Sequence, residues 1–482
     1  MIRLKHIYLG LSILSTTFIF GQTAQPVSHY PQMYENQVSV REPEKNVLTV
    51  KEQIDININT VMTDPVLKNA DWGFVIYDPK TRKIVNSYNE TTAFVPASTT
   101  KLLTTETAMS LLGPSFRWIT QLEYSGNINE NGVLDGNLYI VGSGDPSLGT
   151  GKAGAARYSE IISDFTNALR EKGIRRINGD IIIQTALFKD NKRETLPENI
   201  VWMDFNNYYL PAGTTKDINP RNEKLIVKSK NPFENNRQYF YISPYIHKLV
   251  FADQFDGGYL TTKLPDAPAY LANNFRLNLI RNKIPVTGKV MTKMVEVQPE
   301  ARQMITAYKS PTLGAIINDT NHRSDNALAE ALMRMVGFQK NGDHTPESGR
   351  AVVTEHLKNE GFDMSGLTYA DGSGLSRNNK VTPMSQVKFL TSLMEQPYYQ
   401  EFFESLPTGG QTGTLKKMFF GNGYGQIHAK TGTLNKVKTL AGYIRTHSGK
   451  TLAFSLLINN YAGSVDQVKA RMEKILEPAV DL

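Results

Sequence analysis

The chain has 482 residues, of which 40% are hydrophobic and 21% are charged, so it is a globular protein large enough for about two to four domains. Its 53 basic and 46 acidic residues give a net charge of +7, but they are interspersed and form no basic run, which argues against a nucleic-acid partner. The chain contains no cysteine, which excludes disulfides, thiol chemistry and lipidated cysteine.

The N-terminus is typical of an export signal. Arg3 and Lys5 precede an apolar stretch, residues 7–20, that is too short for a comfortable membrane span. We predict a signal peptide over residues 1–24, a flexible lead-in over residues 25–46, and export to the periplasm or cell envelope. An uncleaved anchor is the alternative, and peripheral membrane association and the oligomeric state stay open.

Residues 47–114 are predicted to be the first part of a folded domain. Residues 72–78 alternate like a strand, and residues 83–89 return as a second strand after an Asp-Pro-Lys turn. The stretch FVPASTTKLLTTETAMSLLG, residues 94–113, predicts a helix that begins at Ser98 and stops at its final glycine, because a proline follows.

Residues 115–304 have a different texture, with short strands separated by Gly, Asn and Asp. The predicted strands lie in WITQLEYSG, GNLYIVGSG and GDIIIQ, and one helix is predicted over residues 156–172. We therefore predict one or two inserted strand-rich domains over these residues.

Residues 305–482 return to a mixed pattern. A helix in SDNALAEALMRMVG is predicted to stop at Gly337, and a helix in VTPMSQVKFLTSLM is predicted to be capped by Thr382. Two long strands lie on either side of a Ser-Gly turn, and a last helix covers residues 464–476. The matching character of both ends of the chain predicts an α/β (α+β) fold in which a long strand-rich insertion interrupts one domain.

Three short motifs follow one another along the chain. They are Ser98-Thr99-Thr100-Lys101, Ser324-Asp325-Asn326 and Lys430-Thr431-Gly432. Ser-x-x-Lys and Ser-x-Asn each arise by chance roughly once or twice in a chain of this size, so a single motif is weak. Their order and placement carry the weight, since the first opens a helix, the second precedes a helix and the third precedes two strands.

The first motif suits nucleophilic catalysis. Positions i and i+3 share a helix face, so Lys101 can remove the proton that makes Ser98 a poor nucleophile. The amine can act as a base only when its pKa falls well below about 10.4, which burial or a second cation such as Lys430 would cause. The helix start also offers a backbone N–H to an oxyanion.

Each motif also has a plain structural explanation. Ser98 could simply cap the helix that follows it, Ser324 or Asp325 could cap the helix after the second motif, and Lys430 could be an exposed strand residue. The stretch QTGTLKK, residues 411–417, imitates the third motif without its leading lysine, and we interpret it as a turn. Other chemistries lack support: the chain has no Gly-x-Ser-x-Gly elbow, no paired metal-ligand histidines and no nucleotide-binding glycine loop, so no metal or cofactor is expected.

Together, the three motifs resemble the active-site signature of penicillin-binding proteins and serine β-lactamases. The 223 positions from Lys101 to Ser324 resemble the long insertion of the class C low-molecular-mass penicillin-binding proteins, the D-alanyl-D-alanine carboxypeptidase/endopeptidases. YADGSGLSRNN, residues 369–379, and GSGDPSL, residues 142–148, are similar to that family as well. The resemblance implies a β-lactamase/transpeptidase-like domain, in which an antiparallel sheet packs with a helical cluster.

The resemblance implies an acyl-enzyme mechanism that uses no cofactor. Ser98 would attack the carbonyl between two D-alanines, and Lys101 would accept its proton. Ser324 would relay a proton to the leaving D-alanine, and Asn326 would hydrogen-bond the substrate amide. Lys430 would balance the terminal carboxylate and help to hold the first lysine neutral.

The resemblance also implies a set of substrate-binding residues, namely Thr431, Gly432, Thr433 and Asp145. The two threonine hydroxyls would share the terminal carboxylate, and the backbone N–H groups of Ser98 and Thr433 would form the oxyanion hole. Asp145 would pair with the free amine of the diamino acid in the stem peptide, which suits a carboxylate. A turn-forming role for Asp145 before a proline is the alternative.

The leading hypothesis is an exported serine D,D-peptidase that cuts D-Ala-D-Ala termini or D-Ala-diamino acid cross-links of peptidoglycan and is inhibited by β-lactams. A serine β-lactamase is the second, with LPENI, residues 196–200, as a faint candidate for activating water, although the long insertion argues against it. A non-catalytic peptidoglycan-binding protein on the same fold is the third, but it would not need all five catalytic residues. The balance between carboxypeptidase and endopeptidase activity stays open.

Overall fold

The computed structural model describes residues 48–185, 200–203, 208–211, 240–242, 249–251, 267–293 and 300–482. These residues belong to one unit, Leu48–Leu482. The predicted signal peptide and lead-in, most of the LPENI motif and much of the middle of the insertion lie outside the described residues. The predicted domain bounds stay predictions.

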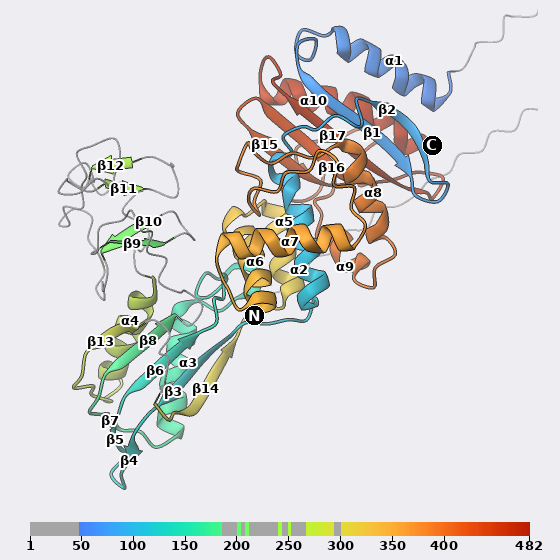
Figure 1. Ribbon diagram of the computed structural model, residues 1–482. Coiled ribbons are helices and arrows are strands. Elements are labelled where there is room, and N and C mark those ends of the chain that lie inside the picture. The colour runs from blue at the N-terminus through green and yellow to red at the C-terminus, as the bar shows by residue number, and fades with distance from the viewer. Residues whose placement is uncertain are drawn as a thin grey trace, which may run out of the picture. The chain divides into compact units, whose positions relative to one another are not determined.

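Both ends of the chain contribute to one five-stranded antiparallel sheet with the order β15-β16-β17-β1-β2 (Figure 1). The N-terminal β1 pairs with the C-terminal β17, so residues nearly 400 positions apart lie side by side, as in the pair Asp71↔Asn459. The predicted strands at both ends are confirmed. The strand bounds are Asp71–Asp78 (β1), Lys83–Tyr88 (β2), Ile427–Leu434 (β15), Val437–Arg445 (β16) and Thr451–Asn459 (β17).

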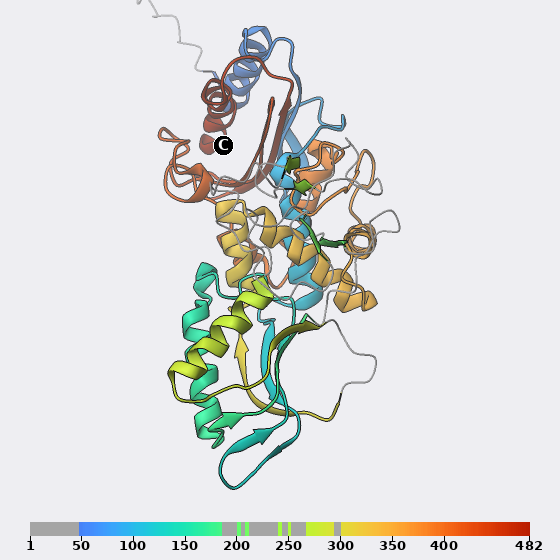
Figure 2. The ribbon, with the colours of Figure 1, turned by 90° about the vertical axis from the view of Figure 1, so that its left-hand side faces the viewer.

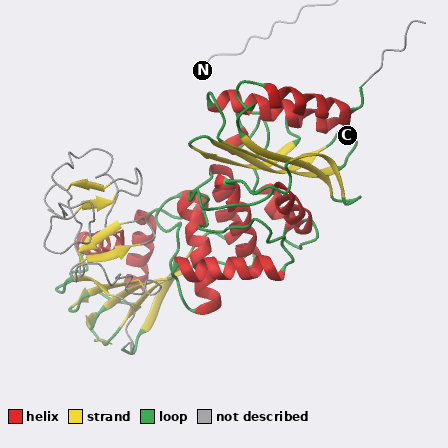
Figure 3. Cartoon of the chain, turned by 45° about the horizontal axis from the view of Figure 1, so that its top comes forward, coloured by secondary structure: helices red, strands yellow, loops and turns green. Residues whose placement is uncertain are grey.

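This sheet is covered by helices on both faces (Figure 3). Along β1 the side chains alternate, so that Phe74 and Ile76 join one apolar cluster while Val75 joins the other. The helices α1 (Val50–Thr63) and α10 (Val465–Leu476) pack on the first cluster. The helices α2 (Lys101–Leu112) and α8 (Pro383–Leu393) pack on the second. Burial on both faces explains why apolar side chains follow one another in β17 from Leu452 to Ile458, interrupted only by Ser455.

The second apolar cluster continues into a group of helices. Their bounds are Leu313–Arg323 (α5), Asn326–Asn341 (α6), Pro346–Asn359 (α7) and Tyr399–Glu404 (α9). The prediction that a helix stops at Gly337 is wrong, because α6 runs on to Asn341 and is capped by Gly342 with φ 65°. A Cβ atom on Gly337 would lie 2.6 Å from the backbone nitrogen of Gly349, so this glycine allows α6 and α7 to approach closely.

The insertion contains a second five-stranded sheet with the order β13-β8-β6-β3-β14. The pairs β13–β8 and β8–β6 are parallel, whereas β6–β3 and β3–β14 are antiparallel. The predicted strands β3, β6 and β8 are confirmed. The bounds are Ile119–Tyr124 (β3), Leu138–Gly142 (β6), Ile181–Thr185 (β8), Val290–Lys293 (β13) and Gln303–Lys309 (β14).

Two helices, α3 (Tyr158–Glu171) and α4 (Ala267–Arg281), cover one face of this sheet (Figure 2). The prediction of a single helix in the insertion is therefore wrong. The missed helix presents Leu271, Phe275 and Leu279 at intervals of four residues, and all three are buried against the sheet. That spacing was the available signal, but Pro268 and an Asn pair within the segment obscured it.

The remaining strands are short. A three-stranded sheet contains β4 (Asn127–Ile128), β5 (Val133–Asp135) and β7 (Arg176–Ile177), and two ribbons pair β9 (Ile200–Met203) with β10 (Tyr208–Pro211) and β11 (Phe240–Ile242) with β12 (Leu249–Phe251).

The insertion leaves and rejoins the flanking chain at one place. There the backbone N–H of Trp118 donates to Ser310 Oγ at 3.0 Å. Among the described helices none has the length and apolar character needed to cross a membrane.

Candidate active site

Ser98 lies in a short 3₁₀ turn, η1 (Ala97–Thr100), which runs directly into α2. The alternative that Ser98 merely caps the helix is wrong, because Ser98 lies inside η1 and occupies neither N-cap position. The N-cap residues of η1 and α2 are Pro96 and Thr100, and neither makes a side-chain cap bond. Instead, Ser98 Oγ accepts a hydrogen bond from Lys101 Nζ at 3.1 Å. The serine is half-buried and the lysine is fully buried.

Three oxygen atoms surround the amine of Lys101. Besides the hydroxyl of Ser98, Nζ contacts Asn326 Oδ1 at 2.7 Å and the backbone carbonyl oxygen of Ser373 at 2.5 Å. The amide and carbonyl oxygens can only accept hydrogen bonds, so each takes one N–H of the amine. A neutral amine has two N–H groups and one lone pair, and the lone pair is then left for the proton of Ser98.

Burial lowers the pKa of Lys101 to about 8, against an opposing effect of the carboxylates of Glu330, Asp371 and Asp325. Burial also lowers the pKa of Lys430, and the charges of Lys101 and Lys438 lower it further, to well below its ordinary value. Lys101 has carboxylates nearby and three hydrogen-bond acceptors, whereas cations surround Lys430, so Lys101 holds a proton more readily than Lys430.

Lys430 lies within β15 rather than ahead of the strands, and its side chain is fully buried, so its interpretation as an exposed strand residue is wrong. Its Nζ donates to the backbone oxygen of Thr431 at 2.9 Å. The next glycine, Gly432, brings β15 against the turn that contains the serine. A Cβ atom there would lie 2.0 Å from Thr439 Oγ1 and 2.7 Å from the backbone oxygen of Pro96, so only glycine fits.

The two threonine hydroxyls of the third motif already have protein partners. Thr431 Oγ1 donates to Thr414 Oγ1 at 2.7 Å, and Thr433 Oγ1 accepts from Lys438 Nζ at 2.7 Å. Thr414 belongs to η6 (Gly413–Leu415), inside the QTGTLKK stretch. That stretch is indeed a turn, but it also contacts the motif that it imitates.

The second motif joins two helices. Ser324 follows α5 in the left-handed conformation, with φ 58°. Asp325 caps α6, because its Oδ1 accepts from the backbone N–H of Leu328 at 3.1 Å, and Asn326 is the first residue of that helix. Of the two candidates for the cap, Ser324 and Asp325, the second therefore performs this role.

The sequence analysis missed two residues that hold Lys101, namely Ser373, which contacts the amine, and Glu330, which fixes Ser373. The backbone N–H of Ser373 donates to Glu330 Oε1 at 2.8 Å, which fixes the carbonyl of the same residue. Burial raises the pKa of Glu330, and the charge of Asp371 raises it further. Asp371 in turn accepts from the backbone N–H groups of Gly374 and Ser376, each at 2.6 Å. The available signal was that Glu330 follows Asn326 by four positions on the same helix face.

Asp145 lies in the loop that follows β6. Its Oδ1 accepts from the backbone N–H and the hydroxyl of Ser147, at 2.8 and 2.6 Å, which is the geometry of a turn. Its buried Oδ2 has no hydrogen-bond partner among the described residues, and burial raises its pKa. The far end of the same loop reaches the second motif, because Lys152 Nζ lies 2.5 Å from Asp325 Oδ2.

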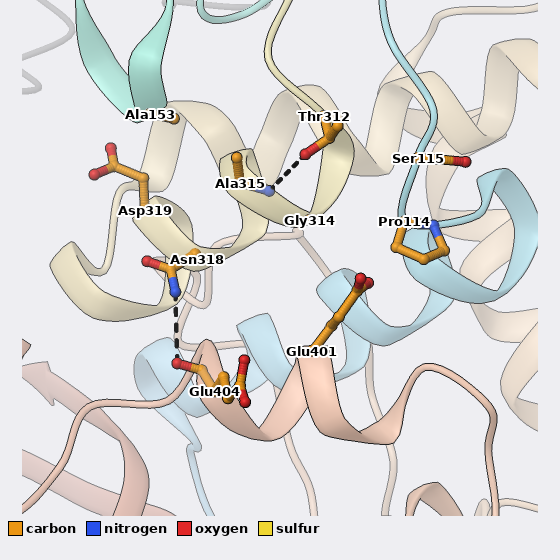
Figure 4. Close-up of a pocket in the computed structure, with 10 residues that line it drawn as sticks. All are labelled: Pro114, Ser115, Ala153, Thr312, Gly314, Ala315, Asn318, Asp319, Glu401 and Glu404. Atoms are coloured by element: carbon orange, nitrogen blue, oxygen red, sulfur yellow. Dashed lines mark hydrogen bonds between the residues drawn. The ribbon is translucent and has the colours of Figure 1, made fainter.

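A pocket of about 550 Å³ lies elsewhere, beside α5 and α9 (Figure 4). None of the nine predicted site residues lines it. Its lining residues are Pro114, Ser115, Ala153, Thr312, Gly314, Ala315, Asn318, Asp319, Glu401 and Glu404. Within the described part of the chain, no group of three or more His, Cys, Asp or Glu side chains is arranged to hold a metal ion.

The serine, the buried lysine and the asparagine lie together in this fold, and comparison with known proteins identifies the family. The profile of the D-Ala-D-Ala carboxypeptidase 3 (S13) family matches residues 54–254 and 251–478. The chain belongs to this family. The family, the fold and the serine peptidase class predicted from the three motifs are thereby confirmed.

Two curated relatives match most of the chain. D-alanyl-D-alanine carboxypeptidase DacB of Haemophilus influenzae is 28% identical over 449 residues, covering 85% of this chain and 89% of the relative. D-alanyl-D-alanine carboxypeptidase of Actinomadura sp. strain R39 is 27% identical over 447 residues, covering 84% and 81%. The crystal structure of penicillin binding protein 4 (DacB) from H. influenzae aligns with a TM-score of 0.64 at 25% identity, covering 88% of this chain and 98% of that one. Another structure of that protein contains a bound β-lactam.

Proposed function

We propose that this protein hydrolyses the D-Ala-D-Ala termini of peptidoglycan stem peptides, and the D-Ala-diamino acid cross-links between them, through an acyl-enzyme on Ser98. The observation that carries the proposal is the amine of Lys101, fully buried and 3.1 Å from the serine hydroxyl. Because its pKa is near 8, a useful fraction of this amine is neutral at physiological pH.

In the first step, Ser98 Oγ bonds to the carbonyl carbon of the penultimate D-Ala while its proton passes to Lys101 Nζ. The carbonyl electrons move onto oxygen, where the backbone N–H groups of Ser98 and Thr433 act as the oxyanion hole. The C–N bond then breaks, and the leaving amine takes a proton that is relayed by Ser324. Asn326 holds both the Lys101 amine and the substrate amide. Water then cleaves the ester, which restores the serine hydroxyl.

Lys430 links substrate binding to activation of the base. Among the described residues, the backbone oxygen of Thr431 is the one acceptor of the fully buried amine of Lys430. A substrate carboxylate placed beside it would stabilise its charged form, and the resulting cation would favour the neutral form of Lys101. The hydroxyl of Thr433 accepts from Lys438, so its own proton remains available for the same carboxylate.

Asp145 is the residue that we assign to substrate choice. A buried carboxylate oxygen without a partner is costly, and an incoming ammonium would satisfy it. The free amine of a diamino acid in the stem peptide is such a group. β-Lactams would acylate the same serine, and a relative of the same family has been crystallised with one. The N-terminal apolar stretch supports export to the periplasm or cell envelope.

The proposal is tested by incubating the purified protein with a stem pentapeptide that ends in D-Ala-D-Ala and with a cross-linked dimer. We expect release of free D-alanine from the first and of two monomers from the second. Ser98→Ala should abolish both reactions, whereas Ser448→Ala, in an exposed hairpin turn, should change neither. Unchanged cleavage by Ser98→Ala would contradict the proposal.

A second measurement separates the peptidase from a β-lactamase on the same fold. We expect stoichiometric labelling by benzylpenicillin and very slow turnover of nitrocefin, because a peptidase lacks a group that rapidly activates water at the acyl-enzyme. Rapid nitrocefin turnover without peptide cleavage would instead identify a β-lactamase.

A further inference from the structure

We propose that Lys152, on the loop after β6 in the insertion, is a positioning residue that holds the second motif of the active site through Asp325. The inference rests on the proposed peptidase function and deepens it, since it assigns a role in acylation to a residue outside the three motifs.

The contact joins two parts of the chain that are 173 positions apart. Lys152 Nζ donates to Asp325 Oδ2 at 2.5 Å, while the other oxygen of the same carboxylate accepts from the backbone N–H of Leu328. The lysine side chain is 42% exposed and the aspartate side chain is 14% exposed, so the carboxylate is largely shielded from water. Its charge is therefore balanced mainly by this lysine and the start of α6.

The second motif needs such support because of its backbone conformation. Ser324 has φ 58°, a left-handed conformation that costs a residue other than glycine of the order of 1 kcal/mol. The serine lies between the end of α5 and Asp325, and Asn326 follows immediately. A tether on Asp325 thus restrains, by one peptide bond in each direction, both Ser324 and Asn326, and the amide oxygen of Asn326 accepts from Lys101 Nζ at 2.7 Å.

The loop that carries Lys152 is itself well ordered by local bonds. Thr150 Oγ1 accepts from the backbone N–H of Lys152 at 3.1 Å and donates to the backbone oxygen of Ser147 at 2.6 Å. Ala153, the next residue, packs against the apolar cluster of the helical group. The lysine is therefore presented from a braced turn rather than from a free loop.

The ion pair also affects the catalytic base. Asp325 is one of the carboxylates that raise the pKa of Lys101, together with Glu330 from α6 and Asp371 from the loop after it, while Lys430 faces the same amine from β15. Burial acts to raise the pKa of Asp325, but the hydrogen bond from Lys152 and the backbone bond at Leu328 hold it below its ordinary value. Without the positive charge of Lys152, the negative charge of Asp325 would raise the pKa of Lys101 further.

The experiment compares Lys152→Met, which keeps the length of the side chain but removes the charge, with Lys152→Arg and the wild type. The acylation rate by benzylpenicillin is measured from pH 6 to 10 at saturating and limiting concentrations. Lys469→Met is the matched control, because Lys469 also forms an ion pair, with the exposed carboxylate of Asp466 at 2.9 Å, and lies on α10. Thermal unfolding of each variant reports whether it is folded.

We expect Lys152→Met to lower the limiting acylation rate about tenfold, with the concentration dependence changed less than about twofold. Its pH profile should move to higher pH, and Lys152→Arg should restore the rate to within about threefold of the wild type. Lys469→Met should match the wild type. A Lys152→Met protein with the wild-type rate and pH profile would overturn the inference alone, whereas a wild type that never acylates would overturn the proposed function as well.

Asp325→Asn gives an independent check that does not depend on the lysine variant folding well. If the two side chains act as one unit, the double variant Lys152→Met/Asp325→Asn should acylate no more slowly than the slower single variant. Fully additive losses would show that Lys152 does not act through Asp325.

Discussion

The regions around the two five-stranded sheets differ in the kinds of polar side chain that they bury. Around the β15-β16-β17-β1-β2 sheet and its helices, several charged or titratable side chains are buried, among them Lys101, Glu106, His356, Lys430 and Lys438. Among the insertion residues whose burial is described, the buried polar side chains are uncharged, namely Thr120, Ser125, Ser147, Thr166 and Gln184. The difference separates a part that buries the charged groups of the reaction from the apolar core of the insertion, which serves packing; Asp145 and Lys152 lie on the loop after β6, outside that core.

Buried charge has opposite effects on catalysis and on stability. Desolvation gives a lysine the lowered pKa that a base requires, but it makes the folded state less favourable than one with an apolar side chain at the same place. The β15-β16-β17-β1-β2 sheet and its helices should therefore contain residues whose replacement destroys activity while preserving or improving stability. Residues in the apolar core of the insertion should behave in the opposite way.

The largest effect is expected from Lys101→Met. The variant keeps the apolar stem but removes the amine that accepts the proton of Ser98, so acylation by benzylpenicillin should fall by about a thousandfold or more. The second-order acylation rate measures this. A variant that is folded and acylates within about tenfold of the wild type would show that another group is the base.

Lys430→Met should lower acylation about a hundredfold, because the substrate carboxylate loses its cation. The same change should raise the free energy of unfolding by about 2 kcal/mol at pH 7. Burial lowers the pKa of Lys430 in the fold, so the unfolded chain binds this proton more tightly, wild-type stability rises with pH, and the advantage of the variant shrinks toward pH 10. Denaturant unfolding at both pH values tests the sign, and a loss of stability at pH 7 would contradict it.

The pH dependence of acylation should follow the neutral form of Lys101. Since its pKa is about 8, the rate should rise about tenfold per pH unit below pH 8 and level off above it. A rate profile for benzylpenicillin from pH 5 to 9 measures this directly. A flat profile between pH 6 and 8 would mean that the base is already neutral there.

Glu106→Gln tests a buried charge on α2 to which the proposed mechanism assigns no role. Glu106 accepts from His356 Nε2 at 3.2 Å and from Tyr398 at 2.9 Å. Burial opposes the charge on the histidine, but the bond and charge of Glu106 raise the pKa of His356 above its ordinary value. The pair therefore stabilises the fold fully below pH 6.5, and this contribution is lost as pH rises through the folded pKa.

Unfolding of Glu106→Gln should accordingly require about 3 kcal/mol less than the wild type at pH 6, with a smaller difference at pH 9. Asp481→Asn removes an exposed partner of His447 and should change stability by less than about 0.5 kcal/mol. An equal loss for Glu106→Gln at both pH values would show that the charge on His356 does not matter.

The smallest effect on activity is expected in the core of the insertion. Phe275→Ala removes a fully buried ring that meets Phe165 edge to face at 5.9 Å between ring centres. Unfolding should require about 3 kcal/mol less, while acylation of the folded protein by benzylpenicillin at low temperature should change by less than about twofold. A tenfold loss of acylation would break the division between the two parts.

The motifs were predictable because chemistry fixes their spacing. A base one turn from its serine must lie three positions on, so Ser98 and Lys101 could be paired without a structure. β1, β2, β16 and β17 of the first sheet and β3, β6 and β8 of the second were predictable from alternation and turns, whereas β13, β14 and β15 were not predicted. The contacts were not: the carbonyl of Ser373 has no side-chain signature, and Glu330 and Lys152 gain their positions only when distant segments pack together.

The two incorrect helix predictions have similar causes. The stop predicted at Gly337 reflects a local rule that close packing of α6 on α7 overrides. The helix α4 was hidden by local proline and asparagine preferences, although its apolar spacing is regular. In both cases tertiary contacts outweighed a weak local preference.

The central claim is that the hydroxyl of Ser98, activated by Lys101, is the group that is acylated. Peptide mass spectrometry of the protein after treatment with benzylpenicillin tests it most directly. We expect one equivalent of adduct, on the peptide that contains Ser98, and none in Ser98→Ala. An adduct on another serine, or full labelling of Ser98→Ala, would contradict this account.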